Sequence, residues 1–169
     1  MTLPGTATWS GLPGRHRHPV TRSWPSIENH NGKIDSGKEL FGNYTAQPKS
    51  ANPNGYLALA EFDNRENGGN GDGIIDSRDA VFSHLRLWID ENHDGVSQAN
   101  ELHTLPELGV YSISLRYRDD RHFFDEYGNW FHYHATLNPD PLDGESKDGR
   151  STYDVFFRVL NDRGIGGNQ

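Results

Sequence analysis

One twelve-residue segment, 90–101, constrains this chain more than any other feature. It reads Asp-Glu-Asn-His-Asp-Gly-Val-Ser-Gln-Ala-Asn-Glu, with oxygen-bearing side chains at its first, third, fifth, ninth and twelfth positions. A glycine at the sixth position allows the sharp turn that brings such side chains to a common centre. The spacing predicts a loop that surrounds a hard divalent cation, with ligands from Asp90, Asn92, Asp94, the carbonyl of Val96, Gln98 and Glu101.

This arrangement is the ligand pattern of an EF-hand calcium loop, in which carboxylate, amide and carbonyl oxygens replace water around Ca²⁺. The dipeptide Asp94-Gly95 alone would indicate only a common turn. The regular spacing of the other oxygens and the terminal carboxylate of Glu101 make the pattern specific for a metal loop.

A second segment, 63–79, repeats the pattern less regularly. Aligning Gly73 with the glycine of the first loop places oxygens at the third, fifth, seventh, ninth and twelfth positions, from Asn70, Asp72, the carbonyl of Ile74, Asp76 and Asp79. The first position falls on Gly68, which has no side chain. We therefore expect the intervening residues to bulge outward and Asp63 to supply the first ligand.

A weaker third copy spans 29–39, with candidate ligands Asn29, Asn31, the carbonyl of Lys33, Asp35 and Glu39. Its first position is Ile27, and Glu39 stands one residue late. Fewer carboxylates attract a doubly charged ion less strongly. The sequence thus predicts two Ca²⁺ sites and leaves the occupancy of the third open.

Charge and composition favour a fold that depends on such ions. The net charge is −8, only 33% of residues are hydrophobic, and 19 are glycines. Residues 61–101 contain ten acidic and three basic side chains, a net charge of −7. These carboxylates repel one another until a cation binds, so we expect Ca²⁺ binding energy to contribute to folding. The absence of cysteine excludes disulfides and thiolate-bound metal.

The sequence predicts four successive regions. They are an irregular basic arm over 1–26, the metal loops over 27–110, antiparallel strands over 111–160 and a flexible tail over 161–169. Within the second region, apolar residues between Asp79 and Ile89 have helical spacing, which predicts a helix joining the two loops. A shorter helix is predicted over Leu57–Phe62.

Strands are predicted where apolar and polar residues alternate, over Tyr111–Tyr117, Trp130–Leu137 and Tyr153–Leu160. The predicted fold class is therefore α+β, with tandem EF-hand-like calcium loops and short helices followed by a small antiparallel β-sheet.

Several runs of sequence resemble a known family. They are Ile34-Asp35, Glu39 to Asn43, Gly55 to Asp63, Asn70 to Asp76, Leu85 to Trp88, Asp94 to Leu102 and Leu105 to Gly109. Together they resemble the bacterial EF-hand-like calcium modules of secreted RTX and adhesin-type proteins, and are similar to the self-processing module of iron-regulated RTX proteins. The resemblance covers about residues 27–117. It implies secretion, calcium-driven folding and membership of a larger protein, although this sequence starts without the apolar segment of a signal peptide.

In the self-processing members, the chain is cut at an Asp-Pro bond just before the module, when the aspartate side chain attacks its own carbonyl. Here the basic arm stands in that place, and the one Asp-Pro bond, Asp140-Pro141, lies downstream in a predicted loop. We therefore expect a non-enzymatic calcium module, with calcium-dependent self-processing as the rival hypothesis.

A third hypothesis is a module that binds sugar or protein through aromatic residues of its sheet, with structural calcium. The candidates Tyr117, Trp130, Phe131 and Tyr133 fit a buried sheet core better. Zinc binding by His132 and His134, which would share one face of a strand, is not favoured, because the sequence shows no evident carboxylate partner and no cysteine. We expect a monomer that binds calcium and neighbouring domains, without a nucleic-acid site or a membrane span.

Overall fold

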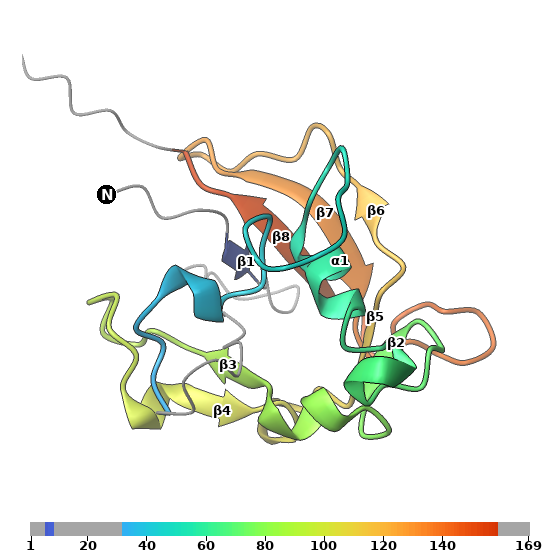
Figure 1. The fold of residues 1–169 in the computed structure, drawn as a ribbon. Coiled ribbons are helices and arrows are strands. Elements are labelled where there is room, and N and C mark those ends of the chain that lie inside the picture. The colour runs from blue at the N-terminus through green and yellow to red at the C-terminus, as the bar shows by residue number, and fades with distance from the viewer. Residues whose placement is uncertain (1–5, 9–31, 159–169) are drawn as a thin grey trace, which may run out of the picture.

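Antiparallel strand pairing organises the chain. The structure is a computed structural model that describes residues 6–8 and 32–158. Its strands are β1 (Thr6–Thr8), β2 (Ile74–Asp76), β3 (Arg86–Trp88), β4 (Leu102–Thr104), β5 (Ser112–Ser114), β6 (Arg118–Asp119), β7 (Trp130–Thr136) and β8 (Ser151–Phe156). They form one four-stranded sheet in the order β1-β8-β7-β6 and two small sheets, β2–β5 and β3–β4 (Figure 1).

Helices contribute little to the described part of the chain. The single α-helix is α1 (Gly55–Ala60), and the 3-10 helices are η1 (Gly37–Glu39), η2 (Arg65–Asn67), η3 (Ala80–His84), η4 (Ala99–Glu101) and η5 (Pro106–Leu108). The helix α1 begins at Asn54, whose buried side chain accepts a hydrogen bond from the Leu57 N–H at 3.0 Å. The predicted helix over Leu57–Phe62 thus exists, although it begins and ends two residues earlier.

The predicted α+β class, with tandem EF-hand helices around the calcium loops, is wrong. Most regular structure is strand. The loop 63–79 lies between the six-residue helix α1 and the 3-10 helix η3, and the loop 90–101 lies between the strands β3 and β4, so neither loop has the paired helices of an EF-hand. The main error concerns the segment between the two loops, which forms η3 and then β3.

A helical and a strand pattern of apolar residues overlap in that segment, and the tertiary structure favours the strand pattern. Val81, Phe82 and Leu85 fit one face of a helix, whereas Leu85 and Leu87 are buried on either side of the half-buried Arg86, as in a strand. Strand β3 pairs with β4, with Leu87 opposite His103, and both leucines are fully buried. Because the pairing partner lies about fifteen residues downstream, the local pattern could not reveal it.

The strand predicted over Tyr111–Tyr117 is shorter in the structure. Only Ser112–Ser114 form a strand, β5, which pairs with β2 and places Ile113 opposite Ile75. The strand β6, which pairs with β7, begins after the predicted range, at Arg118. An isolated bridge between Ile113 and Leu137 connects β5 to the residue that follows β7. The strand β7 covers nearly all of the predicted range Trp130–Leu137, whereas β8 begins two residues before the predicted Tyr153–Leu160 and ends at Phe156. The two strands run antiparallel to each other, with a bulge between Phe131 and Tyr133.

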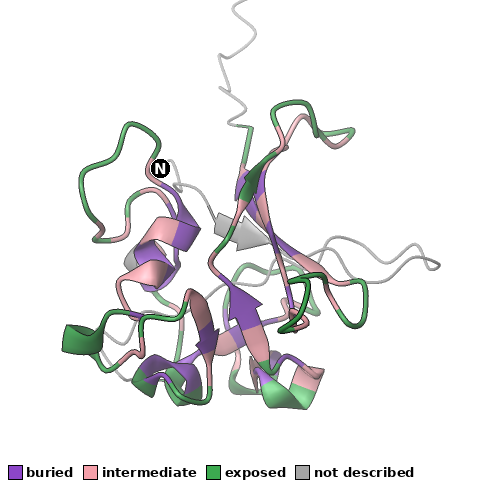
Figure 2. Cartoon of the chain, turned by 90° about the vertical axis from the view of Figure 1, so that its right-hand side faces the viewer, coloured by how far each residue is buried: buried purple, intermediate pink, exposed green. Residues whose placement is uncertain are grey.

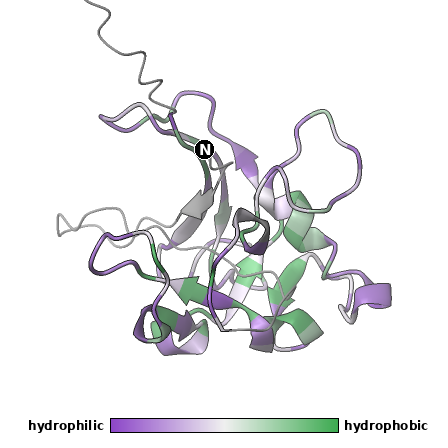
Figure 3. Cartoon of the chain, turned by 60° about the vertical axis from the view of Figure 1, so that its left-hand side comes forward, coloured by the Kyte–Doolittle hydropathy of each residue, from purple (hydrophilic) through white to green (hydrophobic). Residues whose placement is uncertain are grey.

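The main apolar core lies where the two small sheets, η3 and α1 meet. Its fully buried members include Ala58, Ile75, Leu85, Leu87, Leu105, Val110 and Leu137. Figure 2 shows the buried residues gathered along the inner sides of α1 and the small strands, and Figure 3 shows the most hydrophobic segments in the same part of the molecule. Burial of these side chains supplies the main driving force for folding.

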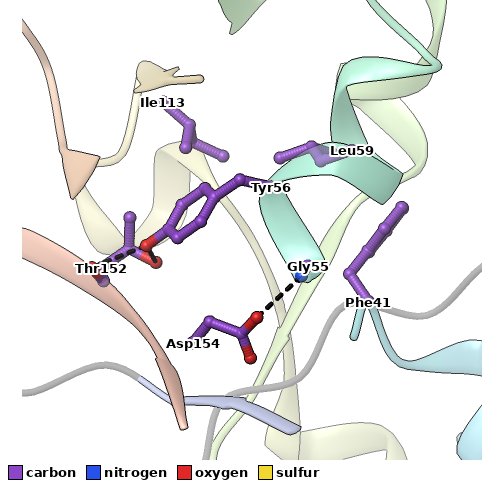
Figure 4. A pocket seen from close by; sticks show the side chains of 7 residues that line it. All are labelled: Phe41, Gly55, Tyr56, Leu59, Ile113, Thr152 and Asp154. Carbon is purple, nitrogen blue, oxygen red and sulfur yellow. Dashed lines mark hydrogen bonds between the residues drawn. The ribbon is translucent and has the colours of Figure 1, made fainter. Parts of the chain in front are cut away.

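The helix α1 is held to the large sheet by two polar contacts. The carboxylate of Asp154 in β8 accepts a 2.8 Å hydrogen bond from the N–H of Gly55, and the Tyr56 hydroxyl donates to the carbonyl of Thr152 at 2.7 Å (Figure 4). Asp154 is only 2% exposed, and it borders a cavity of ≈ 10 Å³ that is also lined by Phe41 and Leu59. Burial raises the pKa of Asp154 to about 6, although the hydrogen bond from Gly55 opposes this shift.

This raised pKa predicts a pH-dependent effect of the substitution Asp154→Asn. A carboxyl with a pKa raised above its unfolded value contributes stability below about pH 4, and that contribution is lost as the pH rises through 6. The asparagine still accepts from Gly55 without a buried charge. We expect the variant to gain roughly 1–3 kcal/mol of unfolding free energy at pH 7.5 and much less at pH 5.

Urea unfolding of the wild-type protein and the variant at both pH values measures the difference in unfolding free energy between them. The titration of all other carboxyls cancels in this difference, because both proteins contain them. An equal loss of stability at pH 5 and 7.5 would show that the amide disrupts packing and that the charge of Asp154 is not costly.

Candidate metal-binding loops

The loop 90–101 is closed at its base by the antiparallel pair β3–β4. Trp88 lies opposite Leu102, and the N–H of Ile89 donates to the carbonyl of Glu101 at 2.9 Å. This pairing brings the first and last candidate ligands, Asp90 and Glu101, to the same end of the loop. Strand pairing therefore provides the closure that helices provide in an EF-hand.

Inside this loop, the carboxylate of Asp90 accepts the N–H groups of Asp94 and Gly95 at 3.2 and 3.0 Å. The Asp94 carboxylate accepts from the amide groups of Asn92 and Gln98 at 3.0 and 2.8 Å. The N–H of Val96 also donates to Asp94 and lowers its pKa. Three of the predicted ligand residues, Asn92, Val96 and Gln98, thus donate hydrogen bonds to the carboxylate of a fourth, Asp94.

Glu101 is a buried anion that is held by three N–H groups. It is 1% exposed, and its carboxylate accepts from Trp88 Nε1 at 3.1 Å and from the backbone of Gln98 and Glu91 at 3.2 Å each. Burial raises the pKa of Glu101, but these hydrogen bonds outweigh burial and the net shift is downward. The hydrogen bond from Trp88 was not predicted, because the sequence analysis did not predict the strand β3 or its pairing with β4.

The loop 63–79 folds around the carboxylate of Asp63. Its two oxygens accept the N–H groups of Gly71 at 2.9 Å and Gly73 at 2.8 Å. The residues between turn outward through η2, as the N–H of Gly69 returns to the carbonyl of Asn64 at 3.0 Å. Asp63 therefore lies at the position where the sequence required a first ligand, and its role as a ligand stays a prediction.

The other end of this loop contains Asp79, which is 3% exposed and accepts from the N–H groups of Asn70 and Asp76 at 3.1 and 2.8 Å. Burial raises the pKa of Asp79, and the charges of Asp63 and Asp76 raise it further. The loop thus concentrates negative charge in a place where water is largely excluded.

Arg78 is a partner that sequence reasoning missed. Its guanidinium lies 2.6 Å from an oxygen of Asp72 and 2.6 Å from an oxygen of Asp76. This hydrogen bonding lowers the pKa of Asp76. The signal was present in the sequence, since an arginine two residues after a candidate ligand can turn back onto it.

The third candidate segment is only partly described. Asn29 and Asn31 lie outside the described residues, Lys33 and Asp35 are exposed, and Glu39 is 2% exposed. The carboxylate of Glu39 accepts hydrogen bonds from the N–H groups of Asp35 and Ser36 at 2.9 Å each, which caps the N-terminus of η1.

This third segment also contacts the loop 90–101. The N–H of Ile34 donates to the hydroxyl of Ser97 at 2.7 Å, and that hydroxyl donates to the carbonyl of Ile34 at 3.2 Å. The third candidate segment is therefore attached through Ile34 to the strongest candidate loop.

The donor chemistry of both main loops fits a hard cation such as Ca²⁺. Their side chains and carbonyls are oxygen ligands, and a carboxylate has about four lone-pair positions, so its N–H bonds leave room for an ion. In the described ranges, however, no three His, Cys, Asp or Glu side chains are grouped as a metal site. Much of the predicted ligand set consists of amide and backbone oxygens, and ion binding would have to draw the carboxylates inward.

The sheet residues considered for other functions have different environments. Phe131 and Tyr133 are buried, as expected for core residues. His132 Nε2 lies 3.1 Å from a carboxylate oxygen of Asp119, and His134 pairs with Asp120. These carboxylate partners come from β6 and its end, and the sequence did not indicate them.

The comparisons with known proteins agree with a module of a larger protein. The family model of the SPM domain matches residues 27–158. The iron-regulated protein FrpA of Neisseria meningitidis serogroup C is 53% identical over 92 residues, which are 54% of this chain and 8% of that protein. None of the helices in the described part of the chain has the length and apolarity of a membrane span.

The packing of the loop 63–79 predicts a severe effect of Gly69→Ala. A Cβ at this position would lie 2.2 Å from the carbonyl carbon and oxygen of Asp63, so the backbone of the loop would have to move. We expect a loss of roughly 2–4 kcal/mol of unfolding free energy, measured by urea denaturation. Gly71→Ala is the matched control, because its Cβ meets nothing within 4 Å and only its positive φ of 76° is unfavourable. A loss no greater than that of the control would contradict the close approach to Asp63.

Proposed function

The chain belongs to the SPM domain family, and on this premise we propose that it is a non-catalytic calcium-binding module of a larger protein. In this proposal, one Ca²⁺ binds in the loop 63–79 and another in the loop 90–101. The ions stabilise the fold and carry out no chemical step.

The observation that supports the proposal most strongly is the burial of carboxylates at the ends of both loops. Asp63, Asp79 and Glu101 are 7%, 3% and 1% exposed. Transfer of ionised carboxylates out of water is unfavourable unless charge and hydrogen bonds compensate it. Backbone N–H groups compensate part of this cost, and a divalent ion would supply the opposite charge.

The connection between the loops explains how bound ions would stabilise the whole domain. Only η3 and β3 separate Asp79 from Asp90, and these elements carry core residues such as Leu85 and Leu87. Ions at both ends of this segment would hold it in place. Ligands that bind only the folded chain increase its stability by mass action.

The family resemblance supports a proposal about the parent protein and its location. The matched relative is an iron-regulated protein of which this chain corresponds to 8% of the length. We propose that the chain is likewise one module of a longer secreted bacterial protein. Extracellular calcium modules have dissociation constants near 10⁻⁴–10⁻³ M, and we expect an affinity on the order of 10⁻⁵–10⁻³ M here.

The geometry around the single Asp-Pro bond supports a non-catalytic role. The Asp140 side chain accepts the N–H of Leu142 at 2.8 Å, and its other oxygen lies 3.8 Å from Lys147 Nζ. The Asp140 carbonyl accepts the N–H of Gly144 at 2.8 Å, as in a closed turn. These contacts hold the carboxylate in a loop of ordinary structure.

Removal of calcium is expected to lower the melting temperature. At a free Ca²⁺ concentration a hundredfold above the dissociation constant, binding adds about 2.7 kcal/mol, which corresponds to roughly 5–10 °C for a chain of this size. Thermal unfolding with calcium and with excess chelator measures this shift. Trp88 fluorescence should change in the same calcium titration, because its indole N–H contacts Glu101.

The double variant Asp90→Ala with Asp94→Ala should lose the part of this shift that comes from the loop 90–101. Glu91→Ala is the matched control, because Glu91 is exposed in the same loop and is not a predicted ligand. Equal melting temperatures of the wild-type protein in calcium and in chelator would refute the proposed function.

Incubation with calcium is expected to leave the chain intact. If Asp140 attacked its own carbonyl, the bond to Pro141 would break and denaturing electrophoresis would show two fragments or cross-linked products. The variant Asp140→Asn provides the control, since it cannot form the cyclic anhydride. Calcium-dependent fragments of wild type that disappear in this variant would favour the self-processing rival.

A further inference from the structure

Arg78 occupies the charged side of the loop 63–79. Its Nη2 lies 2.6 Å from Asp72 Oδ2 and 2.6 Å from Asp76 Oδ2. Its Nε donates to both oxygens of Asp76, at 3.0 and 3.1 Å. These two carboxylates are the predicted fifth and ninth ligands, so one guanidinium joins two groups that a metal ion would also join.

We propose that Arg78 is a tethered cation that competes with the divalent ion for Asp72 and Asp76. It sets the calcium affinity of the loop 63–79 and keeps this loop ordered when calcium is scarce. The inference rests on the proposed function, since it concerns the same calcium loop.

The charges of the loop explain why such a cation is useful. Asp63, Asp72, Asp76 and Asp79 bring four carboxylates into one short segment, and two of them are buried. In the absence of an ion, their repulsion opposes closure of the loop. The guanidinium neutralises part of this charge, and its planar fork can contact two carboxylates at once.

The surroundings allow Arg78 to leave when an ion arrives. Its side chain is 58% exposed, so it is not held by packing. It also borders an open cavity of ≈ 350 Å³ that is lined by Ser77, Phe82 and Ser83, among others. Release of the guanidinium therefore needs only a rotation of one long side chain.

If Arg78 instead supported calcium binding, its removal would weaken the affinity of the loop 63–79. An arginine that stayed on the outer lone pairs of Asp76 would orient this carboxylate towards the ion and strengthen binding. A competing arginine repels the ion and occupies its ligands, so its removal strengthens binding. The sign of the change in affinity separates the two roles.

The experiment is a calcium titration of the intact chain and of Arg78→Gln, followed by the backbone amide signals of Gly71 and Gly73. Both N–H groups donate to Asp63 and report the loop 63–79, whereas Gly95 donates to Asp90 and reports the other loop in the same sample. We expect roughly tenfold tighter binding at Gly71 and Gly73, with little change at Gly95. This gain should shrink as salt is added, because the exposed charge is screened.

The matched control is Arg65→Gln, which removes the same charge from an exposed position in η2 of the same loop. It should change the affinity far less than Arg78→Gln. In chelator, Arg78→Gln should also melt a few degrees below wild type, because the carboxylates lose their counter-charge.

Unchanged or weaker binding at Gly71 and Gly73 in Arg78→Gln, with wild type binding normally, overturns the inference and leaves the proposed function intact. Binding by Arg78→Gln at a loop that stays empty in wild type supports the inference and corrects the proposed function for this loop. If neither protein binds calcium at any concentration used, the proposed function and the inference both fail.

Discussion

The structure depends on how closely spaced carboxylates are accommodated at the ends of two loops. Asp63, Asp79 and Glu101 are buried, and backbone N–H groups point at each of them. A buried anion is tolerated only when hydrogen bonds or opposite charge replace its water. The glycine-rich course of the loop 63–79 follows from this need, since the N–H groups of Gly71 and Gly73 approach the carboxylate of Asp63 from inside the turn.

The two loops are part of the core and not appendages to it. The segment from Asp79 to Asp90 leaves one loop, places Leu85 and Leu87 in the apolar interior, and enters the next loop. The strand β2 lies within the first loop and places Ile75 in the same interior, where it pairs with Ile113. Because each loop end continues directly into buried strand residues, a disturbance of loop closure reaches the packing of the whole domain.

The sequence revealed the loops because their signal is local, and it missed what depends on distant partners. Oxygen-bearing residues at fixed spacing predicted the segments that the structure turns around Asp63 and Asp90. The helix predicted between the loops was wrong, because β3 is stabilised by pairing with β4, and the local pattern of apolar residues does not show a partner that is distant in the sequence. The contacts of Trp88 with Glu101 and of Asp154 with Gly55 arise from tertiary structure, and no sequence motif predicts them.

The replacement of EF-hand helices by short strands also limits what ion binding could do in this domain. A calcium sensor converts ion binding into a change of angle between two long helices, which then expose an apolar groove. Here the elements next to the loops are the six-residue helix α1 and strands and 3-10 helices of three to five residues, already paired or packed in the core. Such elements provide no lever arm, so the free energy of a bound ion would appear as resistance to unfolding and not as motion.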